Sequence, residues 1–277
     1  MKLKQFITEE YLNSSRGIKL SSARLYELIK SGDYDVALKN KIQIYRGVNS
    51  TNDQIIINPK NHVRVSANTL NIYTKLIDSF ESWEDYPKRS ESLICSLNID
   101  VATSYGNLYV VLPKNDAKIG ICPTDDIWSS FNNIGDMVIF NETIYTFILK
   151  PIEKAFRFKF KTDFDDHGLI DILKSIKFIR HYDNDRFKMR VKNKILNLNY
   201  YDLSYLRKFI NNDNYDNLYD YLEYIFKPEL NDFTLVKLKD FNSLISDDRE
   251  CWTDSESIMI NADLFNKIKD KLINHEA

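Results

Sequence analysis

The chain has 277 residues, of which 43% are hydrophobic and 28% charged, a composition that suits one large or two small globular domains and excludes intrinsic disorder. No run approaches the roughly 18 apolar residues of a membrane span, and the N-terminal stretch MKLKQFITEEYLN does not resemble a signal peptide, so we expect a cytoplasmic protein. The scattered cysteines and histidines, and the lack of GxGxxG or GxxxxGK[ST], give no support for a disulfide framework, a metal site, a Rossmann site or a P-loop.

The first predicted elements are a helix and a strand that carries an arginine. SSARLYELIKSG begins with serines that can cap a helix and stops at Gly32. The next segment, IQIYRGV, alternates as a strand, which places Arg46 on the same face as Ile42 and Ile44. Because a guanidinium cannot lose its proton, Arg46 needs an anionic partner, either a carboxylate of the protein or a phosphate of a ligand.

The middle of the first half predicts three strands and two helices. In ESLICSLNIDVATSYGNLYVVLP we expect a strand at 93–96, a helix at 100–105 with Gly106 as its stop, and a strand at 108–112. AKIGICP adds a strand, and TDDIWSSF predicts a helix with Thr124 as its cap.

Beyond residue 150, basic residues alternate with apolar ones. Residues 150–210 contain 15 Lys and Arg against 8 Asp and Glu, whereas residues 211–277 contain 7 against 15. KAFRFKFK and RFKMRVKNKIL each predict a strand with one cationic face, which is either a solvated surface or a surface that binds nucleic-acid phosphates. The candidate nucleic-acid-binding residues are Arg157, Lys159, Lys161, Arg186, Lys188, Arg190 and Lys192.

Helices and short strands complete the chain. DDHGLIDILKSIKFI has one apolar helical face that runs from Leu169 to Ile179, and the tyrosine-rich segments YYDLSYLRKFI and YDNLYDYLEYIF predict further helices, the second closed by Pro228. TLVKL and SIMIN predict strands, and a terminal helix is expected after Asn261.

Three of these segments, in order, resemble the landmarks of the ADP-ribosyltransferase superfamily of the Arg, Ser, Glu type. IYRG resembles its arginine-bearing strand, LICSLNIDVATSYG its serine-ended strand and following helix, and DDRECW its glutamate turn. RSESLICS and GICPTDDIWSSF are also similar to segments of uncharacterised phage-type proteins. Leu97 and Asn98 replace the usual Thr and second Ser, and Asp248 replaces the first Glu, which puts the acceptor preference in doubt.

The resemblance implies NAD as co-substrate, with no metal, and a set of site residues. Cleavage of the bond between ribose and nicotinamide generates an oxocarbenium-like cation, which a neighbouring carboxylate stabilises. Glu250 would be this carboxylate, and Ser96 would orient it by a hydrogen bond. Arg46, beside Gly47, would neutralise the pyrophosphate. In the helix that follows Ser96, Ala102 and Tyr105 match the family pattern, and Tyr105 or Trp252 would stack on nicotinamide.

Alternatives remain open at the level of sequence. Glu142, in FNETIYTF, also leads into an apolar strand and is a rival catalytic carboxylate. The same oxocarbenium chemistry would allow a DNA glycosylase to release a modified base from DNA. A third hypothesis is a noncatalytic nucleic-acid-binding protein in which Arg46 and Glu250 are structural.

We therefore predict an α+β fold with a split, mostly β ADP-ribosyltransferase-like core. An N-terminal helix and the first part of the core occupy 1–149, an inserted basic and tyrosine-rich region occupies 150–231, and the core resumes with Glu250 and the terminal helix in 232–277. The predicted function is transfer of ADP-ribose from NAD to a macromolecule, with DNA or RNA as the leading acceptor, as a toxin or defence enzyme in phage and host conflict. An antitoxin or host protein partner remains unidentified.

Overall fold

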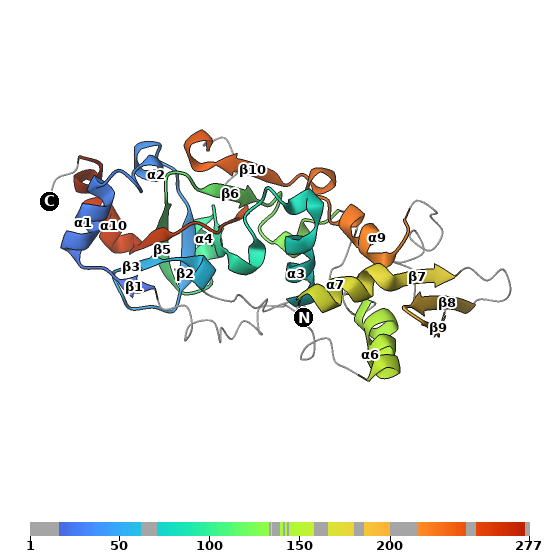
Figure 1. Ribbon diagram of the computed structural model, residues 1–277. Helices are drawn as coiled ribbons and strands as arrows, with labels where there is room; N and C mark the ends of the chain where they lie inside the picture. The colour runs from blue at the N-terminus through green and yellow to red at the C-terminus, as the bar shows by residue number, and fades with distance from the viewer. Residues whose placement is uncertain are drawn as a thin grey trace. The chain divides into compact units, whose positions relative to one another are not determined.

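The protein has an α+β fold, as predicted, with a nine-stranded sheet, a three-stranded sheet and accompanying helices (Figure 1). The computed structural model describes residues 17–61, 71–132, 134, 139–140, 142, 144–157, 166–179, 186–199, 215–241 and 248–274. These residues form two compact units. The first unit draws on 1–68, 84–130 and 232–277, and the second on 69–83 and 131–231.

The nine-stranded sheet of the first unit is antiparallel at every pairing. In spatial order its strands are β1 (Ile18–Lys19), β3 (Gln54–Ile57), β12 (Ser257–Asn261), β5 (Asn107–Pro113), β2 (Tyr45–Val48), β4 (Leu93–Ser96), β11 (Glu250–Thr253), β6 (Lys118–Ile121) and β10 (Thr234–Lys237). Two strands from the C-terminal segment, β12 and β11, each lie between strands from the first half of the chain. The centre of the sheet therefore depends on contacts between distant parts of the sequence.

Four helices of the described first unit begin or end at residues suited to those positions. They are α1 (Ser22–Lys30), α2 (Val36–Lys39), α4 (Ile99–Thr103) and α10 (Ala262–Ile273). The side chain of Ser21 caps α1, Asn98 caps α4 and Asn261 caps α10, each by accepting hydrogen bonds from backbone N–H groups. Gly32 and Gly106 follow α1 and α4 with φ of 82° and 135°, conformations that a side chain would strain. The predicted starts of α1 and α10 are confirmed.

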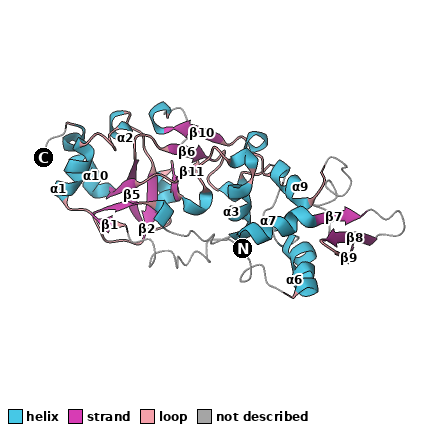
Figure 2. Ribbon diagram, in the orientation of Figure 1, coloured by secondary structure: helices cyan, strands magenta, loops and turns pink. Residues whose placement is uncertain are grey.

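The core of the first unit covers both faces of the sheet. Ile258, Met259 and Ile260 follow one another along β12, and each is at most 1% exposed. Because consecutive strand residues point to opposite faces, apolar side chains must pack on both sides at this position. Figure 2 shows the strands of this sheet in magenta beside the cyan helices.

The second unit has an aromatic core and its own small sheet. Its helices are α3 (Asn71–Ser79), a π-helical turn (Ile144–Leu149), α6 (Lys150–Phe156), α7 (Asp166–Ser175) and α9 (Leu218–Ile225), and its strands are β7 (Ile176–Ile179), β8 (Arg186–Val191) and β9 (Lys194–Asn199). Phe226 is fully buried, and its ring centroid lies 4.6 Å from that of Phe131 and 6.0 Å from that of Tyr73. Aromatic residues of 69–83 and 131–149 therefore pack with this unit, whereas the predicted insertion begins at residue 150.

One basic segment forms a helix end where the alternation predicts a strand. Lys154 to Phe156 are the last residues of α6, which begins with Pro151 in its first turn and ends at Arg157 with φ of 60°. The Lys194 ammonium lies 4.6 Å from the centroid of the Phe156 ring. The strand prediction for these residues was wrong, and Lys159 and Lys161 lie outside the described residues.

The second basic segment is a hairpin and not one strand. β8 ends at Val191, Lys192 adopts φ of 51°, and β9 begins at Lys194, which pairs with Val191. Lys194 therefore lies on the face opposite to Arg190. A positive φ at Lys192 suits a two-residue hairpin loop. The chain therefore turns at Lys192, and this turn interrupts the alternation of basic and apolar residues.

Two other elements refine or correct the predictions, and a third predicted helix is not described. The helix predicted through Ile179 ends at Ser175, where β7 begins, and YYDLSYLRKFI lies outside the described residues. TDDIWSSF forms a 3-10 turn (Ile127–Ser129) whose cap is Asp126 and not Thr124, because the Asp126 carboxylate accepts from the backbone N–H of Trp128 at 2.8 Å.

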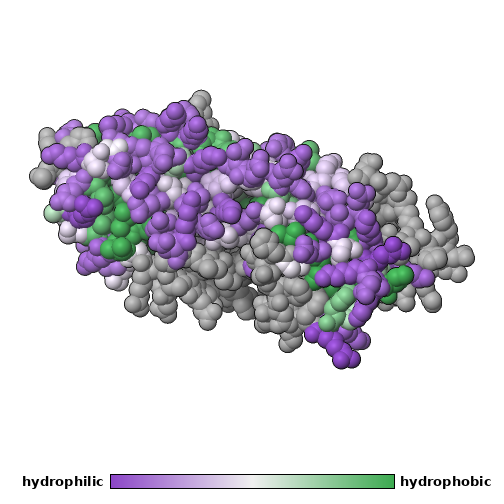
Figure 3. Space-filling model, viewed as in Figure 1, coloured by the Kyte–Doolittle hydropathy of each residue, from purple (hydrophilic) through white to green (hydrophobic). Residues whose placement is uncertain are grey.

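The surface of the described residues is mainly hydrophilic on the face drawn in Figure 3, with separate apolar areas. Ile18 is 72% exposed and Ile195 is 56% exposed. Among the helices that the structure describes, none has the length and hydropathy required to cross a membrane.

Candidate active site

The three sequence landmarks lie on three neighbouring strands. Arg46 is on β2, Ser96 ends β4 and Glu250 begins β11, and the order of these strands in the sheet is β2, β4, β11. Ser96 pairs directly with Tyr45 on one side and with Glu250 on the other. Directly paired residues share a face, so Tyr45, Ser96 and Glu250 form one row across the sheet.

Two further hydrogen bonds join the residues that follow Ser96 to the residues that precede Glu250. The side-chain amide of Asn98 donates to a carboxylate oxygen of Asp248, and the backbone N–H of Leu97 donates to the carbonyl of Arg249 at 2.9 Å. Two of the three positions that depart from the resembled pattern, Asn98 and Asp248, are thus in contact, two residues beyond the Ser96 and Glu250 pair. Ser96 Oγ accepts from the backbone N–H of Asn98 at 3.0 Å, which holds the end of β4 as α4 begins.

Arg46 starts from the opposite face of the sheet. It follows Tyr45 along β2, and it pairs with Tyr109 of β5. The pairing between β2 and β4 covers Tyr45 and Ser96, and the Arg46 guanidinium donates to the carbonyl of Ile94 at the edge where these strands separate. Arg46 is half-buried, and within the described part of the chain no carboxylate forms an ion pair with it. The structure therefore brings Arg46 next to the row without placing it in the row.

Glu250 forms a salt bridge with an arginine that the sequence analysis did not select. Arg89 donates from Nη2 to Oε1 of Glu250, and the two side chains are 1% and 15% exposed. The thiol of Cys122 lies 3.7 Å from the same oxygen. Burial is the largest single influence on Arg89 and disfavours its charge, but the charge and hydrogen bond of Glu250 together with neighbouring acidic groups outweigh burial, so the pKa of Arg89 lies above its ordinary value. Arg89 lies in the polar run PKRSES, which resembles a solvated loop, and no sequence signal marked it.

Trp252 is enclosed by protein groups. It is 1% exposed, its indole N–H donates to the carbonyl of Pro87 at 2.9 Å, and the ring of Tyr86 stacks on it at 6.0 Å. The Arg89 guanidinium lies 5.2 Å from the centroid of the indole ring. A ring packed in this way offers no open face to a ligand, and of the two residues predicted to stack on nicotinamide only Tyr105, which is 41% exposed, is accessible.

Gly47 allows α4 to contact the sheet. A Cβ at this position would lie 1.9 Å from the carbonyl oxygen of Ala102 and 3.1 Å from the Cβ of Tyr105. The glycine predicted to approach a cofactor is therefore required for the approach of a helix, and this contact places Tyr105 next to β2.

Two buried cysteines lie on the reverse face of the sheet, and the charge of Glu250 acts on both. Cys95 and Cys251 pair directly across β4 and β11, and both are buried. Burial raises the pKa of Cys95 to about 12, while the charge of Arg46 lowers it and the charge of Glu250 raises it. Arg46 and Glu250 are thus both close enough to Cys95 to act on it, although their side chains leave the sheet on opposite faces.

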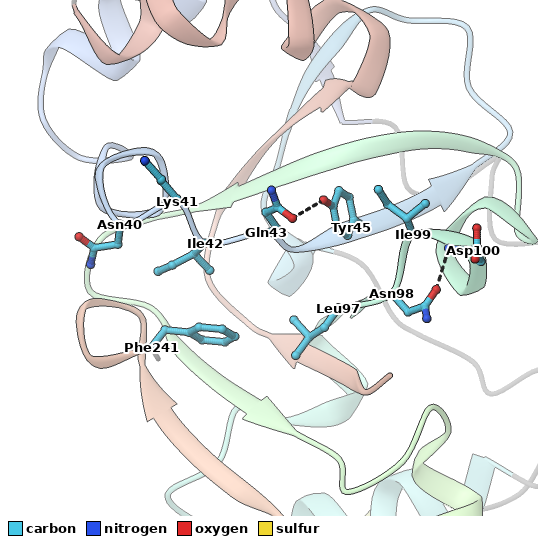
Figure 4. A pocket seen from close by; sticks show the side chains of 10 residues that line it. All are labelled: Asn40, Lys41, Ile42, Gln43, Tyr45, Leu97, Asn98, Ile99, Asp100 and Phe241. Atoms are coloured by element: carbon cyan, nitrogen blue, oxygen red, sulfur yellow. Dashed lines mark hydrogen bonds between the residues drawn. The ribbon is translucent and has the colours of Figure 1, made fainter. Parts of the chain in front are cut away.

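A pocket of about 340 Å³ lies at the Tyr45 end of the row (Figure 4). It is bounded by the end of α2, the start of α4 and Phe241, which follows β10 and the 3-10 turn Leu238–Asp240. Its lining combines aromatic and aliphatic side chains with amides and two charged groups: Asn40, Lys41, Ile42, Gln43, Tyr45, Leu97, Asn98, Ile99, Asp100 and Phe241. Figure 4 shows the Tyr45 hydroxyl directed to Gln43, to which it donates at 2.8 Å. Five of the ten lining residues are polar or charged, so this pocket is more polar than most small-molecule sites, which are lined mainly by apolar side chains.

The basic face lies in the second unit. Along β8, Met189 and Val191 are buried, Lys188 is half-buried and Arg190 is exposed, and Lys177 of β7 pairs with Arg190. Lys192 and Arg157 are exposed, and the Arg186 side chain lies outside the described residues. The rival carboxylate, Glu142, is also exposed in this unit.

Comparison with family models, with curated proteins and with solved structures finds no match to this chain. Within the described residues, no group of three or more His, Cys, Asp or Glu side chains is arranged to hold a metal ion.

Proposed function

We propose that this protein transfers ADP-ribose from NAD to a macromolecular acceptor, with Glu250 as the carboxylate that stabilises the ribosyl cation. The observation that carries the proposal is the direct pairing of Ser96 with Glu250, extended by the contact of Asn98 with Asp248. The resemblance requires these positions to meet, and 154 residues separate Ser96 from Glu250 in the sequence. The same pairing favours Glu250 over Glu142. On this proposal the nine-stranded sheet is the split catalytic core and the second unit is its basic insertion.

The reaction breaks the bond between ribose C1′ and the nicotinamide nitrogen, and the electron pair leaves with nicotinamide. A nucleophile of the acceptor then bonds to C1′ and its proton passes to water. Glu250, held beside the ribose, stabilises the positive charge that develops at C1′ and accepts a hydrogen bond from the 2′-hydroxyl. The proposal requires the Arg46 guanidinium, whose planar donors suit phosphate oxygens, to reach the pyrophosphate around the edge between β2 and β4, where it donates to the carbonyl of Ile94.

The pocket and the row together define where NAD would lie. Neighbouring strands are about 4.8 Å apart, so Tyr45 and Glu250, two strands apart, are separated by about 10 Å. We place the nicotinamide ribose at Glu250, with Tyr105 available to the nicotinamide ring, and the adenosine end in the pocket. The aromatic and amide groups of Tyr45, Phe241 and Gln43 suit a nucleobase.

Nucleic acid is the acceptor class that the described surface favours. Lys177, Lys188 and Arg190 lie on one face of the small sheet, and the residues that alternate with them on β8 are buried. A regular row of cations on a strand can follow a phosphate backbone, with a strong dependence on salt.

The test is incubation of the purified protein with NAD, alone and with DNA, RNA or cell protein, followed by measurement of nicotinamide release and of ADP-ribose mass on each fraction. Glu250→Gln should abolish release, and Glu142→Gln, with an exposed carboxylate in the second unit, should leave it unchanged. Circular dichroism of Glu250→Gln measures whether the variant is folded.

Two results would contradict the proposal. If NAD stays intact in every mixture, transfer is excluded, and the same DNA is then assayed for released base, the product of a glycosylase. If Glu250→Gln is folded and as active as the wild type, Glu250 is not the catalytic carboxylate.

A further inference from the structure

The environment of Arg89 differs from that of the other described ion pairs. Arg89 is 1% exposed, whereas the basic partners of the other described salt bridges, such as Arg24 and Lys39, are 58% and 57% exposed. Arg89 begins the 3-10 turn Arg89–Glu91, which ends two residues before β4, and it therefore lies on the chain segment that leads directly to Ser96. The buried guanidinium of Arg89 forms a salt bridge with Glu250, the carboxylate to which we assign the catalysis.

A layer of packed rings fixes Arg89. Its guanidinium lies over the ring of Trp252, and that ring lies against Gly120, its partner residue on β6. A Cβ at position 120 would lie 2.3 Å from Cζ2 of the indole, so only glycine leaves room for the ring. Tyr86 stacks on Trp252, with 18° between the ring planes. These contacts leave the Arg89 fork little freedom to turn away from Glu250.

Stability alone is a weak reason for such a pair. The cost of removing two charges from water often equals or exceeds the attraction gained, and apolar replacements of buried ion pairs are frequently neutral or stabilising. The geometric effect is different, because a guanidinium has donors in a rigid plane and holds a carboxylate oxygen in one direction. Catalysis is sensitive to this, since a displacement of about 1 Å can cost about 100-fold in rate.

We propose that Arg89 is the positioning residue of the catalytic site, which holds the Glu250 carboxylate in the orientation needed at ribose C1′. The inference rests on the proposed function, because it assigns Glu250 the catalytic role. Arg46 and Arg89 then have separate tasks. The half-buried Arg46 binds the phosphates of the substrate, and the buried Arg89 orients the protein's own carboxylate without touching the substrate.

The experiment compares wild type, Arg89→Lys, Arg89→Met and the control Arg24→Met, which removes an exposed arginine from a surface ion pair with Glu27. Nicotinamide release gives kcat and KM for NAD, and thermal unfolding establishes the folded fraction of each variant. We expect Arg89→Met to lower kcat about 100-fold with KM changed less than threefold, Arg89→Lys to recover part of kcat, and Arg24→Met to match wild type. An unchanged kcat per folded molecule of Arg89→Met would overturn the inference and leave Arg89 a structural residue.

Crystal structures of wild type and Arg89→Met separate this inference from the proposed function. The expected result is a displaced Glu250 carboxylate in the variant, with Ser96 and the strand backbone unmoved. If Glu250 keeps its position without Arg89, the positioning role is excluded whatever the activity. If wild type itself does not release nicotinamide, the proposed function fails, and the position of Glu250 in the two structures still decides whether Arg89 orients it.

Discussion

Ser96 and Glu250, 154 positions apart in the sequence, lie directly opposite each other across β4 and β11. Cys95 and Cys251, the next pair, are both buried, so the register of these strands is set by the core on the reverse face. A shift by one residue would exchange the two faces and bury Glu250 among apolar side chains. The geometry of the candidate site is therefore a consequence of core packing.

The Arg89 and Glu250 pair predicts strongly non-additive stabilities. Arg89→Met leaves a carboxylate in the site without its guanidinium, and Glu250→Gln leaves a buried cation without its carboxylate, so each should cost about 3–5 kcal/mol of unfolding free energy. The double variant removes both charges and should be less destabilised than the sum by at least about 1 kcal/mol. Urea unfolding of the four proteins measures the coupling, and additive losses would show that the pair does not interact.

Gly47→Ala should destabilise the first unit through α4. The new Cβ would overlap the carbonyl oxygen of Ala102, which is backbone and cannot turn away, so a loss of about 1–3 kcal/mol is expected. Gly32→Ala is the comparison, because position 32 has open space and only the strain of its φ of 82°, about 1 kcal/mol. Equal losses for the two variants in urea unfolding would contradict the packing explanation.

Gly120→Ala should be partly rescued by a smaller ring at position 252. The methyl group would overlap the indole of Trp252, and the expected loss is about 1–3 kcal/mol. Trp252→Phe shortens the ring and loses the hydrogen bond to Pro87, so it is destabilising alone. In the double variant the added methyl group occupies space that the indole no longer fills. The loss of unfolding free energy, measured by thermal unfolding, should therefore be smaller than the sum of the losses of the two single variants. A strictly additive result would place the two residues out of contact.

The hydrogen bond between Tyr34 and Glu256 predicts a pH-dependent contribution to stability. The Tyr34 hydroxyl donates to Glu256 at 2.6 Å, and this bond, with Lys114 nearby at 3.2 Å, lowers the pKa of Glu256. Because the folded state then binds the proton less tightly than the unfolded state, the stabilisation is present at neutral pH and lost as the pH falls below about 4.3.

Tyr34→Phe should therefore cost about 1 kcal/mol or more at pH 7 and less at pH 3. Tyr109→Phe is the matched control, since the Tyr109 hydroxyl donates to the backbone carbonyls of Ser50 and Asn52, which do not titrate. Its loss should be the same at both pH values. Urea unfolding at pH 7 and pH 3 gives the comparison, and a pH-independent loss for Tyr34→Phe would refute the linkage.

The basic face predicts a change in the salt dependence of nucleic-acid binding. Lys188→Ala and Arg190→Ala should each reduce the slope of log binding constant against log salt by about 1 if each side chain contacts one phosphate. Lys267→Ala with Lys269→Ala, both exposed on α10 of the first unit, should leave the slope unchanged. Fluorescence titrations with single-stranded and double-stranded DNA at several salt concentrations measure the slopes. Identical slopes for all proteins would exclude this face as the contact surface.

Local signals in the sequence predicted most elements of the first unit. The alternation of apolar residues identified the strand at Leu93–Ser96, and capping side chains identified the starts of α1 and α10. Strand alternation and helix capping involve residues only two to four positions apart, so a short window of sequence contains the whole signal. The same reasoning was wrong at Lys154–Phe156, because aromatic and basic residues alternate there in a helix that ends at Arg157.

The sequence by itself determined the strands that carry Arg46 and Ser96, but it placed Glu250 in a turn. Only the tertiary structure put Glu250 at the start of a strand and decided how the three side chains meet. It paired Ser96 with Glu250, set Arg46 on the opposite face, buried Trp252 and joined Arg89 to Glu250. Each of these outcomes depends on strand register and burial between residues that are distant in the chain. A run such as PKRSES gives no indication of them, because an arginine in a polar segment has the same local pattern whether water or a buried carboxylate is its partner.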